Sequence, residues 1–473
     1  MKKKINILLL LLAFCALLPA QQNKKYMNWW YFGYYAGLNF NAMQTVSGVS
    51  LPTAVTGPLY TFEGCFTISD ANGNLLMSSD GSIVYNKNNA MMDNGNSLMG
   101  GGSSTQSGIV VPFPGSSTKF YVVTVAEAMG SNGIRYSVVD MTENGGLGKV
   151  ITKNASAKPN ASYENIAAVP HTNGKDYWLV NRTARTFYVW AITELGFSST
   201  PQTFTQSSLY IGSQPWVGEL KFSPSNNFLV SASYYCNSFV YADFNPSTGA
   251  ISNISQKTGV SGVHTVEFSP NEQYVYFGKT GSGFYKIKHA DLVAGNAPTL
   301  VTTFGNIINF KRGPDDRIYG IRHGTRHLFV MMNPNDGGTD VRTFNNYLTN
   351  NAAEGLPTFP NGVLNAQLLG YAACSTYPSQ LEVEIAVSGV DIPATLEWDF
   401  GDGSAKVIEA YTGNGTYAQN YTYPASGMYT VVVTPIKADG TRLASIDQEI
   451  EVLDCPIRTN RMIRTNLSNS NHE

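Results

Sequence analysis

Apolar and polar residues alternate in many short segments of this chain, and a polar turn follows most of them. The phrases ELKFSPSNNFLV and TVEFSPNEQYVYF both place an apolar strand before a Ser-Pro turn and a second strand after it, and Pro224 and Pro270 are 46 residues apart. Similar text surrounds Pro112 and Pro170. Alternation with a period of two, bounded by turn residues, predicts antiparallel sheets built from hairpins.

Strand–turn–strand units of about forty to sixty residues follow one another, which is typical of β-propeller blades. One such unit exposes two apolar faces, and stacking the units in a ring buries both. The expected blades cover residues 60–99, 105–160, 163–208, 212–258, 262–304 and 306–350. Residues 28–58, which include the aromatic stretch Asn28–Asn41, and residues 354–371 are expected to form a seventh blade together. The sequence therefore predicts an all-β, seven-bladed (alternatively six-bladed) β-propeller over residues 28–371.

The text changes after residue 371. Leu381, Val383 and Ile385 alternate with polar residues, as a strand with one buried face requires. About eighty residues of this kind predict a small antiparallel β-sandwich, which we place at residues 372–455. The polar residues 456–473 that follow are expected to be a disordered tail.

The first residues have the features of a secretory signal peptide. Three lysines precede an apolar run over Ile5–Leu18, and the small residue Ala20 offers a cleavage site, so we assign residues 1–20 to the signal. A lipoprotein signal at Cys15 is disfavoured, because Phe14 occupies the position where such signals have a small residue. No later stretch reaches the length of ~20 apolar residues that a membrane-spanning helix needs. The mature chain is thus expected to be exported.

Charge and cysteine content narrow the partners and the compartment. Removal of three lysines with the signal takes the formal net charge from −2 to −5, which argues against nucleic acid or anionic lipid as a partner. The cysteines that remain are widely spaced, and their pairing stays open: Cys65, Cys236, Cys374 and Cys455. A Cys374–Cys455 bridge is disfavoured, because parallel first and last strands would put the two ends of the sandwich at opposite poles.

The segment WDFGDG resembles the signature of PKD (polycystic kidney disease-type, immunoglobulin-like) domains, together with YTY at 421–423 and GMYTV at 427–431. The motif residues are Trp398, Asp399, Gly401, Asp402 and Gly403. The resemblance implies an immunoglobulin-like fold for the predicted sandwich. Some PKD domains bind calcium, but a role for Asp399 and Asp402 in forming the turn is the favoured interpretation.

Three N-terminal segments, Trp30–Phe40, Glu63–Gly81 and Ser103–Pro112, resemble exported PKD-domain proteins of Bacteroidota. That family is associated with the cell surface, gliding motility and type IX secretion. Such proteins usually end in a further sorting domain, and the residues after 455 do not resemble one. The resemblance therefore implies a cell-envelope protein and leaves periplasm, outer membrane and cell surface open.

A set of polar residues stands at the starts of the expected inner strands. Gln106, Glu164 and His264 each lie six residues before Pro112, Pro170 and Pro270, and comparable positions hold Glu63, Glu219 and Glu354. Inner strands line the central channel of a propeller, so these six residues are expected to form a polar, mostly acidic ring at one mouth of the channel. A ligand or a basic peptide could bind there, although a structural lining of the channel is the simpler interpretation.

No catalytic, phosphate-binding or metal-binding motif is present. His323 and His327 lie in strand–turn–strand text, so their spacing does not predict a metal site, and no cofactor is expected. We therefore expect a non-catalytic binding or adhesion protein, with a protein or glycan partner at the cell envelope. The alternatives are a structural accessory of a secretion or gliding complex at the outer membrane and, less favoured, an enzyme that degrades glycans or peptides.

Overall fold

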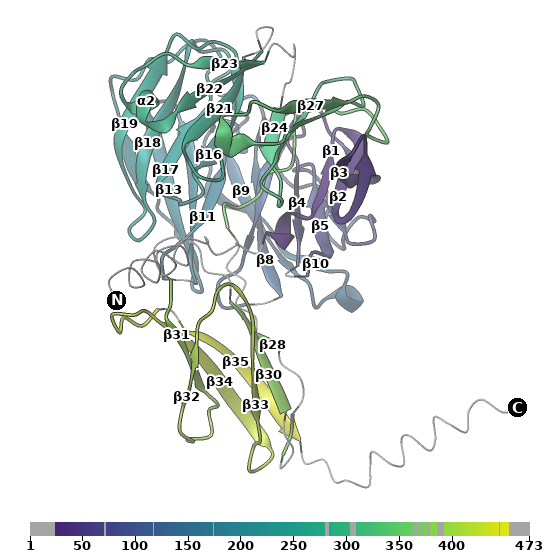
Figure 1. Cartoon of the computed structure of the whole chain (residues 1–473), viewed down its shortest axis with the longest axis vertical. Helices are drawn as coiled ribbons and strands as arrows, with labels where there is room; N and C mark the ends of the chain where they lie inside the picture. The colour runs from purple at the N-terminus through teal and green to yellow at the C-terminus, as the bar shows by residue number, and fades with distance from the viewer. Residues whose placement is uncertain are drawn as a thin grey trace, which may run out of the picture. The chain divides into compact units, whose positions relative to one another are not determined.

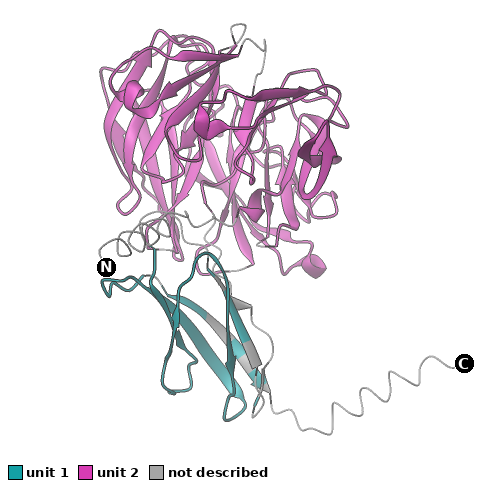
Figure 2. Ribbon diagram, in the orientation of Figure 1, with its two compact units in different colours: residues 1–23, 365–473 teal, residues 24–364 magenta. Residues whose placement is uncertain are grey.

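The chain divides into two compact units (Figure 2). We call residues 24–364, which are magenta and labelled unit 2 in Figure 2, the first unit, and the teal unit that includes residues 365–473 the second unit. The computed structural model describes residues 24–70, 72–116, 118–173, 175–279, 283–302, 309–362, 368–369, 373–375, 379–385, 392–443 and 445–453. The expected signal peptide and polar tail lie outside these residues. Regular structure in the described part is almost entirely strand, so the protein is all-β. The short helices are η1 (Lys25–Met27), η2 (Asn144–Gly146), α2 (His289–Val293) and η3 (Pro334–Asp336).

The described residues of the first unit form seven separate antiparallel sheets, which follow one another along the chain (Figure 1). The first three sheets contain β1 (Trp29–Phe32), β2 (Tyr34–Val46) and β3 (Val49–Tyr60); β4 (Phe66–Ser69), β5 (Leu75–Ser79) and β6 (Val84–Asn86); and β7 (Gly108–Pro112), β8 (Lys119–Val125), β9 (Ile134–Asp140) and β10 (Lys149–Lys158). The fourth contains β11 (Ala167–Pro170), β12 (Tyr177–Thr183), β13 (Thr186–Thr193), β14 (Gly196–Phe197) and β15 (Gln202–Thr205).

The remaining three sheets of the first unit each have four strands in chain order. They contain β16 (Leu220–Phe222), β17 (Phe228–Ser231), β18 (Ser238–Asn245) and β19 (Ala250–Thr258); β20 (Val263–Phe268), β21 (Tyr274–Lys279), β22 (Gly283–Lys288) and β23 (Thr299–Thr302); and β24 (Asn309–Arg312), β25 (Ile318–Ile321), β26 (Leu328–Met331) and β27 (Val341–Phe344). The hairpins predicted from the apolar phrases around Pro170, Pro224 and Pro270 are present as β11–β12, β16–β17 and β20–β21.

Apolar side chains join each sheet to the next. Successive clusters link the second sheet to the third, the third to the fourth, and so on to the seventh. The first strands of these sheets, β4, β7, β11, β16, β20 and β24, are neighbours in the same order. Since each sheet buries one face against its predecessor and one against its successor, the hydrophobic core is divided among the interfaces between sheets.

The aromatic stretch near the N-terminus closes this series. Trp30 and Phe32 of β1 are fully buried, and their cluster also contains Tyr319 of β25 and Val330 of β26, so the first sheet packs on the seventh. On its other side, the Thr67 hydroxyl of β4 donates a hydrogen bond to the carbonyl of Trp29 over 2.6 Å. The stretch is therefore buried packing between the first and last sheets of the unit.

The segment after residue 353 takes a course that differs from the expected one. The sequence placed it in one blade with residues 28–58, whereas Thr358 bridges in parallel to Phe66 of β4, in the neighbouring sheet. Farther on, the Asn361 N–H donates to the carbonyl of Ala168 in β11 over 2.7 Å. The segment thus runs along the inner strands of several sheets.

The described residues of the second unit form two sheets, β28–β30–β33 and β29–β35–β34–β31–β32. Their strands are β28 (Leu368–Leu369), β29 (Ala373–Cys374), β30 (Ser379–Ile385), β31 (Thr395–Asp399), β32 (Val407–Ala410), β33 (Gly415–Tyr421), β34 (Gly427–Ile436) and β35 (Ile446–Leu453). Side chains from both sheets share one apolar cluster around the fully buried Trp398. The alternation predicted for Leu381, Val383 and Ile385 is confirmed, because all three are buried in this cluster.

The prediction that the two ends of the second unit lie at opposite poles is wrong. Strand β29 does run parallel to the last strand, but Cys374 is paired with Leu453 at the end of β35 rather than lying at the opposite pole. The strand-length distance used against a Cys374–Cys455 bridge therefore does not apply, and Cys455 itself lies outside the described residues. Among the described residues, Cys65 and Cys236 are buried free cysteines.

Candidate functional site

Five of the six predicted ring residues are buried, and their main chains join one sheet to the next. They are Glu63, Gln106, Glu164, Glu219 and His264, while Glu354 is half-buried. Five backbone N–H groups donate hydrogen bonds to backbone carbonyls of other segments over 2.8–3.1 Å. The donor and acceptor residues are Glu354 and Phe62, Glu63 and Gly102, Gln106 and Glu164, Glu164 and Trp216, and Glu219 and His264. We call this end of the first unit, where β4, β7, β11, β16 and β20 begin, the mouth. The spacing to the prolines therefore marks the positions where adjacent sheets are bonded together.

Glu164 and Gln106 have most of their bonding capacity satisfied from within the fold. The Glu164 carboxylate accepts hydrogen bonds from the N–H and hydroxyl of Thr105 and from the N–H of Ala128, over 2.6–3.1 Å. The Gln106 side-chain oxygen accepts the N–H groups of Ile166 and Leu220 at 3.0 and 2.8 Å. Burial nevertheless raises the pKa of Glu164, against the effect of its N–H donors.

Glu219 is paired with a buried lysine that sequence reasoning missed. Its carboxylate accepts hydrogen bonds from Thr265 Oγ1 at 2.8 Å and from Asn309 Nδ2 at 3.2 Å, and Lys311 Nζ lies 3.5 Å away. The Lys311 side chain is only 2% exposed. Because both charges are desolvated, each requires the other, and the pair has a structural role in this interior.

A second buried ion pair was also missed. Lys221 Nζ lies 2.9 Å from the carboxylate of Glu267, which also accepts the N–H of Arg312. Burial alone would raise the pKa of Glu267, but the charges of Lys221 and Arg312 outweigh it and lower that pKa. The interior near β16, β20 and β24 therefore has cations matched to its carboxylates.

Glu63 and His264 face each other across the mouth, and each leaves polar atoms unpaired. Glu63 Oε2 lies 4.0 Å from His264 Nε2, and among the described residues neither that oxygen nor either His264 ring nitrogen has a hydrogen-bond partner. The Glu63 carboxyl does have a hydrogen bond with the Thr105 side chain. Burial, with the charges of Glu164 and Glu354, raises the pKa of Glu63 to about 8. Burial lowers the pKa of His264. At neutral pH both groups are therefore mainly uncharged.

The segment after Glu354 enters the interior beyond these residues. A cavity of about 10 Å³ remains among Gln106, Lys311, Thr358 and Asn361, which is room for about one water molecule. The Asn361 side chain also donates to the carbonyl of Ser223. Among the described residues, the segment containing Thr358 and Asn361 therefore occupies the space where the sequence predicted an open channel.

Aromatic side chains surround the mouth at the first and seventh sheets. We call Tyr34, Tyr35, Tyr60, Phe62 and His323 the rim. Ring centroids are 4.9 Å apart for Tyr34 and Tyr60, 5.5 Å for Tyr35 and Tyr60, and 5.5 Å for Phe62 and His323. Tyr35, Tyr60 and Phe62 are 45%, 63% and 41% exposed. His323 Nδ1 lies 3.6 Å from the Glu354 carboxylate, which joins the rim to the acidic group. Sequence reasoning missed the rim, because alternation alone does not show which face of β3 a neighbouring sheet covers.

The WDFGDG segment builds a turn in the second unit. Asp399 accepts the N–H of Gly401 and Asp402 accepts the N–H of Ser404, both at 3.0 Å. Gly401 and Gly403 have φ of +76° and +81°, which glycine adopts without strain. Among the described residues, no group of three or more metal-ligating side chains comes together. His327, weighed above with His323, accepts the N–H of Asn346 instead.

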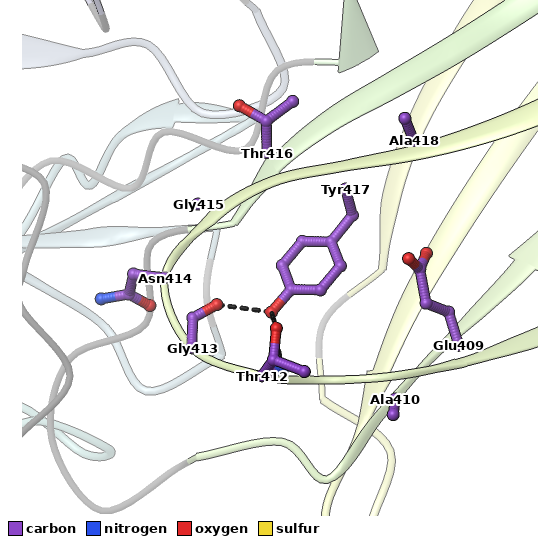
Figure 3. A pocket seen from close by; sticks show the side chains of 9 residues that line it. All are labelled: Glu409, Ala410, Thr412, Gly413, Asn414, Gly415, Thr416, Tyr417 and Ala418. Atoms are coloured by element: carbon purple, nitrogen blue, oxygen red, sulfur yellow. Dashed lines mark hydrogen bonds between the residues drawn. The ribbon is translucent and has the colours of Figure 1, made fainter. Parts of the chain in front are cut away.

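A pocket in the second unit lies at the β32–β33 hairpin (Figure 3). It has a volume of about 320 Å³ and is lined by Glu409, Ala410 and residues 412–418. The Tyr417 hydroxyl donates to the carbonyl of Gly413 and accepts the N–H of Thr412, as the close-up shows. Glu409 accepts hydrogen bonds from Trp398 Nε1 and Gln419 Nε2. The polar side chains of Tyr417 and Glu409 are thus bonded to groups of the hairpin and to Trp398 of β31.

Comparisons with known proteins give structural likeness only. No family model matches the chain, and no curated protein matches its sequence. Solved structures that it is similar to include a functionally unknown protein from Desulfotomaculum acetoxidans (15% identity, TM-score 0.41, 70% of this chain and 99% of that one). Another is the extracellular domain of a protein described as a one-component system of B. thetaiotaomicron (12% identity, TM-score 0.40, 90% of this chain and 56% of that one). A third is a protein described as a 6-phosphogluconolactonase from Bacteroides uniformis (14% identity, TM-score 0.37, 84% of this chain and 97% of that one).

The helices are all short. Within the part of the chain that the structure describes, none is both long and apolar enough to cross a bilayer.

Proposed function

We propose that this chain is an exported, non-catalytic binding protein of the cell envelope. In this proposal residues 28–364 are a seven-bladed β-propeller that serves as a recognition platform. The propeller is supported by the seven sheets in chain order, by the apolar clusters between consecutive sheets, and by the packing of the first sheet on the seventh. The second unit is a PKD-type spacer, which its two sheets around Trp398 and its Asp-Gly turn support.

One observation carries the binding role: the mouth is closed below by packed groups and bordered above by exposed aromatic rings. Glu219 is held by Lys311 and Glu164 by backbone donors, so these carboxylates have structural partners. Tyr60 and Phe62 instead expose large ring surfaces, and the carbonyl of Phe62 accepts the N–H of Glu354. Exposed aromatic groups next to polar ones are typical of interaction surfaces. The proposed binding surface is therefore the rim together with the acidic residues of the mouth.

In-cell photo-crosslinking tests this role. A photoreactive amino acid replaces Tyr60 in one variant and Leu195 in another; both side chains are highly exposed, at 63% and 95%. Leu195 follows β13 at the end where Ile192 pairs with Tyr177 and Tyr177 with Pro170, so it lies at the end of its sheet opposite Glu164. We expect a discrete adduct from the Tyr60 variant and none from the Leu195 variant. Equal or absent adducts at both positions would contradict a binding platform at the mouth.

Protease treatment of intact cells tests the location. Cleavage of the chain on intact cells is expected for a surface adhesin, because the partner then lies outside the outer membrane. Full protection, with cleavage only after the outer membrane is opened, would place the platform in the periplasm and rule out the adhesin version. Lysis in detergent before protease treatment is the control that shows the chain is cleavable.

A further inference from the structure

Four carboxylates at the mouth have no lysine or arginine near them. They belong to Glu63, Glu127, Glu164 and Glu354, and the only ion-pair contacts within 4.0 Å among the described residues are with His264 and His323. The charges of Glu127, Glu164 and Glu354 all act on Glu63 to raise its pKa, after burial. The interior carboxylates of Glu219 and Glu267, by contrast, each have a lysine beside them. The carboxyl groups of the mouth thus differ from those of Glu219 and Glu267 in having no lysine or arginine partner among the described residues.

Two nearly buried polar side chains form the floor of this site, and among the described residues each has atoms without a hydrogen bond. Glu63 is 9% exposed and His264 is 4% exposed. Glu63 Oε2 and both His264 ring nitrogens form no hydrogen bond. Leaving buried polar atoms unpaired is costly, so a donor that enters the mouth gains contacts with the Glu63 oxygen and with the one unprotonated nitrogen of neutral His264, in addition to charge attraction.

Aromatic rings flank the same carboxylates from two sides. On one side, Phe62 and His323 stand with Glu354, whose N–H bonds to the carbonyl of Phe62. On the other, Tyr235 is 51% exposed, and its pKa is raised by burial, by Tyr234 and by the charges of Glu63, Glu354 and Glu164. Exposed ring faces beside carboxylates are the surroundings that bind a planar cation best.

From this juxtaposition we propose that the mouth binds an arginine side chain of a partner protein. The guanidinium lies between Glu63 and Glu354, donates to their free oxygens, and stacks on Phe62 or Tyr235. Arginine is favoured over lysine because its planar fork pairs with carboxylates and stacks on rings at the same time. A glycan is disfavoured, because a neutral ligand brings no counterion to the carboxyl groups of the mouth. The inference rests on the proposed binding role of the mouth and names its ligand.

Titration calorimetry of the full chain with an acetylated tri-arginine amide tests the proposal. We expect Glu354→Gln and Phe62→Ala each to weaken binding about tenfold. Glu194→Gln, an exposed carboxylate at the opposite end of the fourth sheet, is the matched control and is expected to bind normally. Binding is also expected to weaken as salt rises from about 0.05 M to about 0.5 M.

A proton-linked readout separates a cation site from a merely structural effect. Bound arginine stabilises ionised Glu63, so binding releases a proton, and affinity is expected to rise from about pH 6 to about pH 9. Tri-lysine is expected to bind more weakly than tri-arginine, and a neutral tri-glutamine peptide not at all. Equal binding of tri-glutamine, equal binding by Glu354→Gln, or binding of chitohexaose without tri-arginine would overturn the proposal. A Tyr60 adduct in cells combined with no tri-arginine binding would leave the platform intact and reject only the ligand class.

Discussion

Glu63 is a carboxyl group that the fold keeps protonated. Its pKa is about 8, against a usual value of 4.5, because burial and the nearby carboxylates disfavour its charge. A raised acid pKa stabilises the protein below the unfolded-state value, and this contribution is lost as pH rises through the folded-state value. We therefore expect the free energy of unfolding to fall between about pH 4.5 and about pH 8, and Glu63 alone contributes a slope of at most about 1.4 kcal/mol for each pH increment of one. Glu63→Gln should flatten this dependence in urea titrations at several pH values.

The neighbours of Glu63 define the control for this prediction. Glu164 and Glu354 also have raised pKa values, with burial as the main cause, so part of the slope remains in Glu63→Gln. His264, whose pKa is lowered by burial, faces the same group. Glu194→Gln should keep the full slope of the parent. An unchanged slope in Glu63→Gln would show that Glu63 is ionised in the folded protein at neutral pH.

Single residues differ in how far the sequence predicts them. Gln106, Glu164 and His264 were found because each lies six residues before the proline that ends its strand, and Glu63 and Glu219 were found only as comparable positions in other expected blades. Lys221 and Lys311 were missed, because a lysine in an apolar strand indicates a solvent-facing position until a partner is known. Their partners Glu267 and Glu219 lie in other sheets, about fifty to ninety residues away, and no local pattern reports such a distance.

At the scale of elements, the sequence predicted the hairpins, but it did not predict the course of the segment that crosses several sheets after Glu354. We call it the crossing segment. A hairpin has two alternating strands and a turn, and all three leave local signals. The segment from Glu354 to Asn361 bonds to one residue at a time in several sheets, so it has no period. The position of Cys374 was wrongly predicted for a related reason: a two-residue strand pairs only where it touches β35. Which residues pair between two strands that are distant in the sequence depends on the tertiary fold, and local sequence patterns do not report it.

Gly355 shows how tightly the crossing segment is packed. A Cβ atom at this position would lie 1.9 Å from the carbonyl oxygen of Glu63, a backbone atom that cannot move aside. Gly355→Ala is therefore expected to destabilise the first unit by about 1–3 kcal/mol, as overpacking does. The measurement is urea unfolding followed by intrinsic fluorescence.

The control for Gly355 is a glycine with looser surroundings. In Gly130→Ala the new Cβ meets only Glu127 O at 3.1 Å and Ala126 Cβ at 3.4 Å, so a change within about 0.5 kcal/mol is expected. Equal stability of the Gly355 and Gly130 variants would mean that the segment after Glu354 is not held against β4.

In the first unit, stability is distributed over the interfaces between neighbouring sheets. We call the interface at which the first sheet packs on the seventh the seam, and it closes the series of sheets. Trp30 lies at that seam: it is fully buried, and its ring is 5.1 Å from Phe40 and 5.9 Å from Tyr319. Sequence alone indicated that both chain ends of the unit meet. It did not show that β1, β2 and β3 form a sheet of their own, because the pattern of the apolar stretch is compatible with pairing within residues 28–58 and with pairing to residues 354–371.

Deletion of residues 28–41 tests the seam directly. It removes β1 and half of β2, and so exposes the faces of β25, β26 and β4 that they cover. We expect the first unit to lose its cooperative transition in calorimetry, while the second unit, which has its own core around Trp398, keeps its transition. The milder Trp30→Ala should cost about 3–5 kcal/mol, whereas Tyr35→Ala, an exposed ring nearby, should cost little. A truncated chain whose first unit melts like the parent would mean that the remaining six sheets are stable as an open series, and the packing of the first sheet on the seventh would then be incidental to the fold.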